Sequence, residues 1–232
     1  MSTAATTRLT RTRILDAAER LADEGGATAI SMRALGAELG ADPTAVYRHF
    51  PSREAILLAL TDRMFGELAA VFTATDDWRA DLRRVMLEAQ GVYTRHSDLA
   101  LALARQPWDS PVQEAGTEFI LDALTRAGLR GRDLGLMLHV VVTVISGAGL
   151  FFALDRSLHE EHSREELRAV HAELPASTHP HTVAAAADLF PPEQAIYEAL
   201  VESTLDGIER RAESTQSNYV PVSREENHHA QP

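Results

Sequence analysis

Two short helical segments joined by a very short connection constrain this chain more than any other feature of its sequence. The first follows Ser31, a residue type that caps helix N-termini, and stops at Gly40, which can adopt the left-handed backbone that reverses the chain. After two further residues, Pro43 suits the first turn of another helix, which is expected to run to about Phe50. Two short helices crossed over a three-residue turn form a helix-turn-helix, so residues 31–54 predict one.

The rest of the chain also follows a helical pattern. Apolar residues recur every three or four positions between breaks that contain Gly or Pro, and no internal repeat is visible. The expected helices span residues 10–24, 52–72, 78–96, 112–127, 133–158, 164–174 and 191–212. This pattern predicts an all-α fold.

The net charge of −12 is unevenly distributed along the chain. Residues 1–64 contain 8 Arg and 8 acidic residues, whereas the remainder contains 14 Arg and 26 acidic residues. Arg8, Arg11 and Arg13 all precede the first acidic residue, Asp16. This asymmetry favours a DNA-facing end on an otherwise acidic body.

The composition also bears on chemistry and location. Cysteine is absent, which excludes disulfides and thiolate metal sites and is typical of a reducing cytoplasm, the expected location. Residues 1–8 lack the apolar core of a signal peptide. No phosphate-cradling Gly-rich loop, G-x-S-x-G or H-E-x-x-H is present, so nothing in the sequence indicates an enzyme or a cofactor.

The predicted helix-turn-helix divides into an inner and an outer face. Val46 and Phe50 are expected to face inward with Leu35 and Leu39. The outer face then carries Thr44, Ala45, Tyr47, Arg48 and His49. Residues of these types are suited to contacting DNA bases and phosphates.

Two stretches in this region carry a family resemblance. The runs TRILDAAERLADEGG and VYRHFPSREAIL resemble the DNA-binding domain of the TetR family of bacterial repressors, over about residues 8–60. The chain departs from the family where Thr10-Arg11-Thr12-Arg13 stands in place of a Thr-Arg-Glu pattern, and at Gly36, where Ala is more common. The resemblance implies a mobile arm (1–9), a helix-turn-helix domain (10–56), a helical ligand-binding and dimerisation domain (57–212) and a disordered tail (213–232).

The resemblance also implies roles for individual residues on double-stranded operator DNA. Arg33 is expected to reach a base edge or a phosphate, and Thr44 and Ala45 to meet base edges or thymine methyls. Tyr47 and His49 match the pair that contacts the DNA backbone, and Arg53 matches a basic residue at the start of the next helix. A structural interpretation stays open, in which Tyr47 packs on the first helix and His49 caps a carbonyl.

The segment 134–154 contains no charged residue and is long enough to span a bilayer, and part of it has strand propensity. Equal charges flank it, which gives no orientation signal for a span, and Gly135, His139, Thr143 and Ser146 fall on one helical stripe. This pattern favours a helix buried on all sides, in the core of a dimer or beside a pocket. The family resemblance implies a homodimer in which helices 133–158 and 191–212 form a four-helix bundle, without a membrane.

A pocket for a small, largely apolar effector is expected among helices 78–96, 112–127 and 133–158. Its candidate lining residues are Met86, Gln90, Tyr93, His96, Trp108, Phe119, His139, Thr143 and Phe151. They combine apolar surface with a few polar groups, as ligand pockets do, although plain core packing explains such residues too.

A histidine-rich stretch offers a second kind of site. His159 and His162 lie one helical turn apart, followed by His171, His179 and His181, a pattern that zinc could use. Solvated histidines explain the same pattern, and no metal is expected.

The resemblance to the TetR family implies a transcriptional repressor that a ligand releases from DNA. The alternatives are a helical small-molecule-binding protein without DNA binding and a membrane-associated helical protein.

Overall fold

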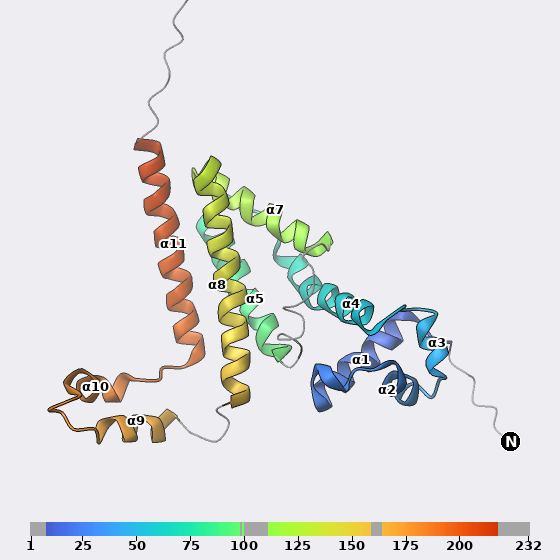
Figure 1. Cartoon of the computed structure of the whole chain (residues 1–232). Helices are drawn as coiled ribbons and strands as arrows, with labels where there is room; N and C mark the ends of the chain where they lie inside the picture. The colour runs from blue at the N-terminus through green and yellow to red at the C-terminus, as the bar shows by residue number, and fades with distance from the viewer. Residues whose placement is uncertain (1–7, 98, 100–110, 159–163, 218–232) are drawn as a thin grey trace, which may run out of the picture.

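The computed structural model describes residues 8–97, 99, 111–158 and 164–217, and every regular element within these ranges is a helix (Figure 1). The predicted all-α fold is therefore confirmed. Most of the arm 1–9, the end of the tail 213–232, Trp108, His159 and His162 lie outside the described residues. The predicted domain boundaries stay predictions.

The N-terminal helices form a small unit of their own, which we call the head. It contains α1 (Arg11–Gly25), α2 (Met32–Glu38), α3 (Pro43–Tyr47) and the start of α4 (Arg53–Gly66), with the 3₁₀ turn η1 (Ala27–Ala29) after α1. A side-chain oxygen caps each of the four α-helices by accepting a backbone N–H, and the capping residues are Thr10, Ser31, Asp42 and Ser52. The predicted helix starts in the head therefore hold.

The tight turn between α2 and α3 depends on two glycines. Gly40 has a φ of 59°, in the left-handed region that favours glycine. A Cβ on Gly36 would lie 2.8 Å from the carbonyl oxygen of Ala41, so the alanine common in the family would force the backbone to shift here. Beneath the turn, Leu35 and Val46 are completely buried.

The remaining helices form the body of the molecule. They are α5 (Trp78–Arg95), α7 (Pro111–Arg126), α8 (Gly131–Leu158) and α11 (Glu193–Ser217), and α5 packs against the other three. The phenol of Tyr197 on α11 is buried and donates a 2.8 Å hydrogen bond to the Met86 carbonyl of α5. Between α5 and α8, a Cβ on Gly149 would lie 2.5 Å from the ring of Tyr93, so these two helices touch very closely.

A buried carboxylate ties the start of the body together. Asp81 on α5 is inaccessible to solvent and accepts hydrogen bonds from the backbone N–H and hydroxyl of Thr75, from Arg84 and from Arg126 on α7. Burial opposes its ionisation, but these donors outweigh burial and hold the pKa of Asp81 below its usual value. Asp81 thus fixes α5 to α7 and to the segment before α5.

The helix α8 is covered only in part within one chain. The stretch Gly131–Leu154 is apolar and long enough to cross a membrane, yet only 28% of its most apolar window is buried. One chain therefore covers α8 only in part, and its predicted burial in a dimer or beside a pocket stays a prediction. Apolar side chains gather on its open face, among them Leu136, Phe151 and Leu154.

Two short helices separate α8 from α11. These are α9 (Arg164–Ala172) and α10 (Pro180–Ala185), followed by the 3₁₀ turn η3 (Ala186–Asp188), and they lie together beyond the lower ends of α8 and α11 (Figure 1). Arg168 holds the return to α11 by donating to the carbonyls of Leu189 and Phe190. The sequence prediction missed α10.

Candidate DNA-binding surface and ligand pocket

The short helix α3 presents the inner and outer faces that its sequence predicts. Val46 and, directly after the helix, Phe50 are completely buried, whereas Thr44 and Arg48 are exposed. Tyr47 is 52% exposed, so its ring is not buried against α1. The outer face, completed by the half-buried Ala45 and His49, is therefore free for a partner.

The two flanking arginines differ from each other. Arg33 on α2 is exposed, as a DNA-contacting residue must be. Arg53 instead points into the protein, where its guanidinium donates 2.8 Å hydrogen bonds to the carbonyls of Ala27 and Ile30. These bonds, from Nε and Nη2, fix α4 to η1, and the predicted phosphate contact of Arg53 stays a prediction.

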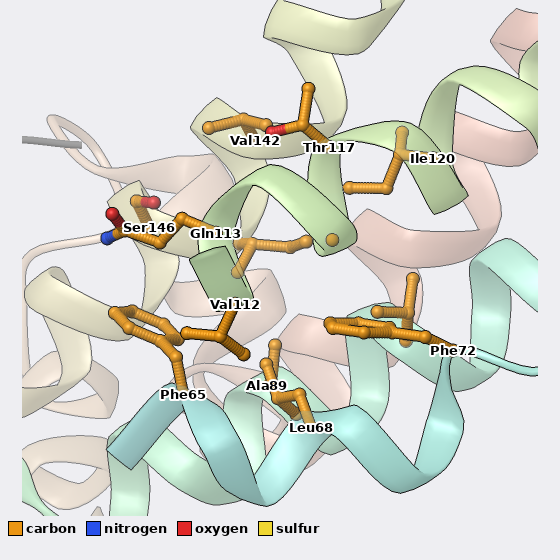
Figure 2. Close-up of a pocket in the computed structure, with 13 residues that line it drawn as sticks. Phe65, Leu68, Phe72, Ala89, Val112, Gln113, Thr117, Ile120, Val142 and Ser146 are labelled. Atoms are coloured by element: carbon orange, nitrogen blue, oxygen red, sulfur yellow. The ribbon is translucent and has the colours of Figure 1, made fainter. Parts of the chain in front are cut away.

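A cavity of about 60 Å³ lies where α4, α5, α7 and α8 meet, together with η2 (Glu67–Val71), the 3₁₀ continuation of α4 (Figure 2). It is lined by Phe65, Leu68, Phe72, Val85, Ala89, Val112, Gln113, Gly116, Thr117, Ile120, Val142, Ile145 and Ser146. No charged side chain lines it. An ion entering this space would lose its hydration without gaining a counter-charge, so the lining favours an uncharged, largely apolar occupant.

The predicted lining residues do not include any of these side chains. Met86, Gln90, Tyr93 and Phe119 are buried, but Tyr93 and Phe119 lie behind the lining, with ring centroids 5.9 Å from Phe65 and 5.6 Å from Phe72. These predictions identified α5 and α7 correctly but chose residues next to those that line the cavity.

The other predicted pocket residues lie further away. His139, Thr143 and the 62%-exposed Phe151 are on the open face of α8. They are therefore corrected to surface positions, because α8 is covered by its own chain on one side only. His96 ends α5 at the junction with α4 and η2.

Charged residues on both sides of α4 link the head to the body. Arg63 on α4 contacts Asp16 and Glu19 of α1, at 2.6 and 3.2 Å. One turn later Glu67 accepts a 2.6 Å hydrogen bond from Arg95, and its other oxygen lies 2.7 Å from Nε2 of His96. Burial disfavours the charge of Glu67, but these partners outweigh it and keep the pKa of Glu67 below its usual value. We call these six residues the junction network.

Sequence reasoning missed the wall that α4 and η2 contribute to the cavity. Phe65, Leu68 and Phe72 all come from the segment predicted as a single helix to residue 72. In the structure α4 ends at Gly66 and tightens into η2, which brings Phe72 against Gly116 of α7. The apolar spacing of the segment predicted burial but could not reveal a void beside it.

The described histidines do not support a metal site. No group of three or more His, Asp or Glu side chains within the described ranges is placed to hold an ion. His171 points Nδ1 at the carbonyl of Leu167, 2.7 Å away, and His181 is exposed.

Comparison with known proteins gives matches to both parts of the chain. Residues 14–60 match the family described as bacterial regulatory proteins, tetR family, and residues 73–212 match the tetracyclin repressor-like C-terminal domain. An HTH-type transcriptional regulator of Saccharopolyspora erythraea is 29% identical over 172 residues, which cover 72% of this chain and 73% of the relative.

Solved structures show the same fold. The transcriptional regulator SCO7222, a TetR from Streptomyces coelicolor, is 25% identical and superimposes with a TM-score of 0.75 over 88% of this chain and 99% of its own. ActR of Streptomyces coelicolor, solved in complex with actinorhodin, is 21% identical, with a TM-score of 0.76 over 87% of this chain and 96% of its own. Both matches extend over the head and the body.

Proposed function

The chain belongs to the TetR family of bacterial regulatory proteins, and from that premise we propose that it is a homodimeric repressor which leaves its operator when a small, uncharged molecule enters the cavity. The observation that carries the proposal is the position of α3. Its inner side chains are locked into the core of the head, while its outer side chains are left to solvent.

The proposed DNA-contacting residues occupy the exposed side of α2 and α3. Arg33 is suited to a guanine edge, and Thr44 and Ala45, at the start of α3, are suited to base edges. Tyr47, Arg48 and His49 would contact the phosphate backbone, which fixes the register of the protein on the duplex. Arg53 is left out because it already serves backbone carbonyls within the head.

A second copy of the chain explains the open face of α8. Leu136, Phe151 and Leu154 are exposed on α8, and Ile196 and Leu200 are exposed on the neighbouring α11. Two such faces packed together form a four-helix bundle that removes this apolar surface from water. The dimer also presents two recognition helices, which doubles the number of base pairs that are read.

The cavity and the head share α4, which suggests how ligand binding reaches DNA. Pockets for drug-sized ligands occupy about 300–1,000 Å³, so a ligand has to enlarge the 60 Å³ space. Behind the lining, α5 and α8 touch closely at Tyr93 and Gly149, which leaves these two helices little room to separate, so the movement is assigned to α4 and η2. The junction network then moves α1 with α4, and ligand and DNA oppose each other with a coupling of about 1–3 kcal/mol.

Selection of duplexes from a random-sequence pool by the full-length protein tests the proposed function. The expected result is one enriched, two-fold symmetric sequence that is bound by two chains and released as salt rises. No enrichment, or binding that ignores sequence, would leave the chain a helical small-molecule-binding protein without DNA binding.

An internal substitute for the ligand tests the coupling. Ala89→Phe adds a ring inside the cavity and is expected to weaken operator binding by about 5–150-fold, the range of allosteric coupling. Thr94→Phe, at an exposed position of the same helix, is the matched control and is expected to change nothing. Unchanged operator affinity in a folded Ala89→Phe dimer would contradict the coupling but not DNA binding.

A further inference from the structure

The recognition helix α3 is too short to hold its own shape. It has five residues, and helices of this length are not stable in isolation. Asp42 fixes its N-terminal end by accepting the backbone N–H of Thr44 at 2.8 Å. At the other end, the amides of His49 and Phe50 both donate to the Val46 carbonyl, and the His49 carbonyl lies beyond these last helical bonds, where helix ends need acceptors satisfied from outside.

Arg11, the first residue of α1, makes two contacts with this end. Its Nη1 donates a 2.6 Å hydrogen bond to the carbonyl oxygen of His49, 38 residues away in the sequence. Its guanidinium carbon lies 4.0 Å from the centroid of the Phe50 ring, which places the cation over the aromatic face. A positive charge at the C-terminal end of a helix is also favoured by the helix dipole.

These contacts leave Arg11 poorly placed to act only as a phosphate ligand. Its planar group is held by a ring on one face and by a carbonyl at one edge, so its orientation is set by the protein. The buried Phe50 is itself fixed in the core of the head. The side chain therefore connects the start of α1 to the last turn after α3.

We propose that Arg11 is a positioning residue for DNA recognition, which holds the end of α3 so that Tyr47 and His49 reach the duplex. This inference rests on the proposed function. It assigns Arg11 a role through its neighbours rather than through DNA. Lysine replaces it only in part, because an ammonium group lacks the planar face that stacks on Phe50.

Amide hydrogen exchange of the full-length protein without DNA tests the holding role. Arg11→Ala is expected to speed the exchange of the His49 and Phe50 amides and to leave those of α5 unchanged. Arg20→Ala is the matched control, because Arg20 lies on the same helix and pairs with Glu38 of α2 at 3.0 Å without touching α3. Equal exchange in the Arg11→Ala and wild-type proteins would overturn the proposal.

Binding to a duplex selected by the wild-type protein, and to the unselected pool, tests the effect on recognition. Arg11→Ala is expected to weaken the selected duplex by about tenfold, with little change for the pool and no change in the salt dependence. Arg11→Lys is expected to recover less than half of the loss.

The opposite pattern identifies a phosphate contact and overturns the proposal. In that case Arg11→Ala weakens binding to the selected duplex and to the unselected pool alike and lowers the slope of the salt dependence by about 0.9. Arg11→Lys then restores binding. A wild-type protein that selects no duplex would instead refute the proposed function, while the exchange experiment would still decide whether Arg11 holds α3.

Discussion

The head and the body of this chain differ in how much of their apolar surface the chain itself covers. The head closes its apolar core within one chain, and its exposed side near α3 carries polar and basic residues such as Arg33 and Arg48. The body leaves apolar side chains of α8 and α11 in the open, among them the 62%-exposed Phe151. The exposed surface of the head therefore suits a polar partner, whereas the exposed surface of the body suits an apolar partner.

This difference indicates where each part is vulnerable. Substitutions on the open side of the head should change DNA binding without changing stability. Substitutions on the open side of the body should change assembly first, and DNA binding as a consequence.

The largest effect is expected on the open face of α8. Leu136→Asp combined with Phe151→Asp places two carboxylates where two large apolar side chains would be buried, each worth about 1.5–3 kcal/mol. The dimer dissociation constant should rise on the order of 100-fold or more, measured by analytical ultracentrifugation. Ala37→Asp, on the exposed side of α2, is the control. A variant that dimerises like the wild type would remove the contrast between head and body.

The next effect concerns the stability of the body. Asp81→Asn removes the charge that Arg84 and Arg126 require and should lower the free energy of unfolding by about 2 kcal/mol in urea titrations. Asp122→Asn also removes a partner of Arg126, but at an exposed site, and should cost less than about 1 kcal/mol. Equal losses would show that burial of Asp81 is unimportant.

On the head, Arg33→Ala should weaken the selected duplex by about tenfold, because one base-edge contact is lost. The melting temperature of the Arg33→Ala protein should match that of the wild type, since Arg33 is exposed. Isothermal binding and calorimetry separate the two quantities. A stability loss without an affinity loss would reverse the roles assigned to this surface.

The smallest effect should appear at the junction network, as a function of pH. The pKa of Glu67 is lowered in the folded protein, so its contribution to stability is present above its ordinary value of 4.5 and is lost as the pH falls through the lowered value. Glu67→Gln should flatten the acid side of the stability profile by less than about 1 kcal/mol, because the pair is partly exposed.

The head could be predicted closely from sequence because its signals are local. Ser31, Gly40, Asp42 and Pro43 fix helix ends through bonds to their nearest neighbours, and α2 and α3 begin where these residues predict. The orientation of Arg53 could not be predicted, because its carbonyl partners lie more than twenty residues away.

The pocket was harder to predict because a cavity is a defect of packing between elements. Helical spacing places Tyr93 and Phe119 on inward faces, and both are buried. It could not show that Phe65 and Phe72, rather than these two rings, line the cavity. The sequence predicted burial of α8 in a dimer or beside a pocket, and one chain alone leaves a face of it open. An apolar stripe indicates that a helix face is covered but does not say whether the same chain covers it.

The most direct test of the account is the amide exchange of the full-length protein with and without its selected duplex. DNA should slow exchange across α2, the turn at Gly40 and α3, and leave the middle of α8 unchanged. Slower exchange along α8 and α11 with an unaffected α3 would contradict the assignment of DNA binding to the head.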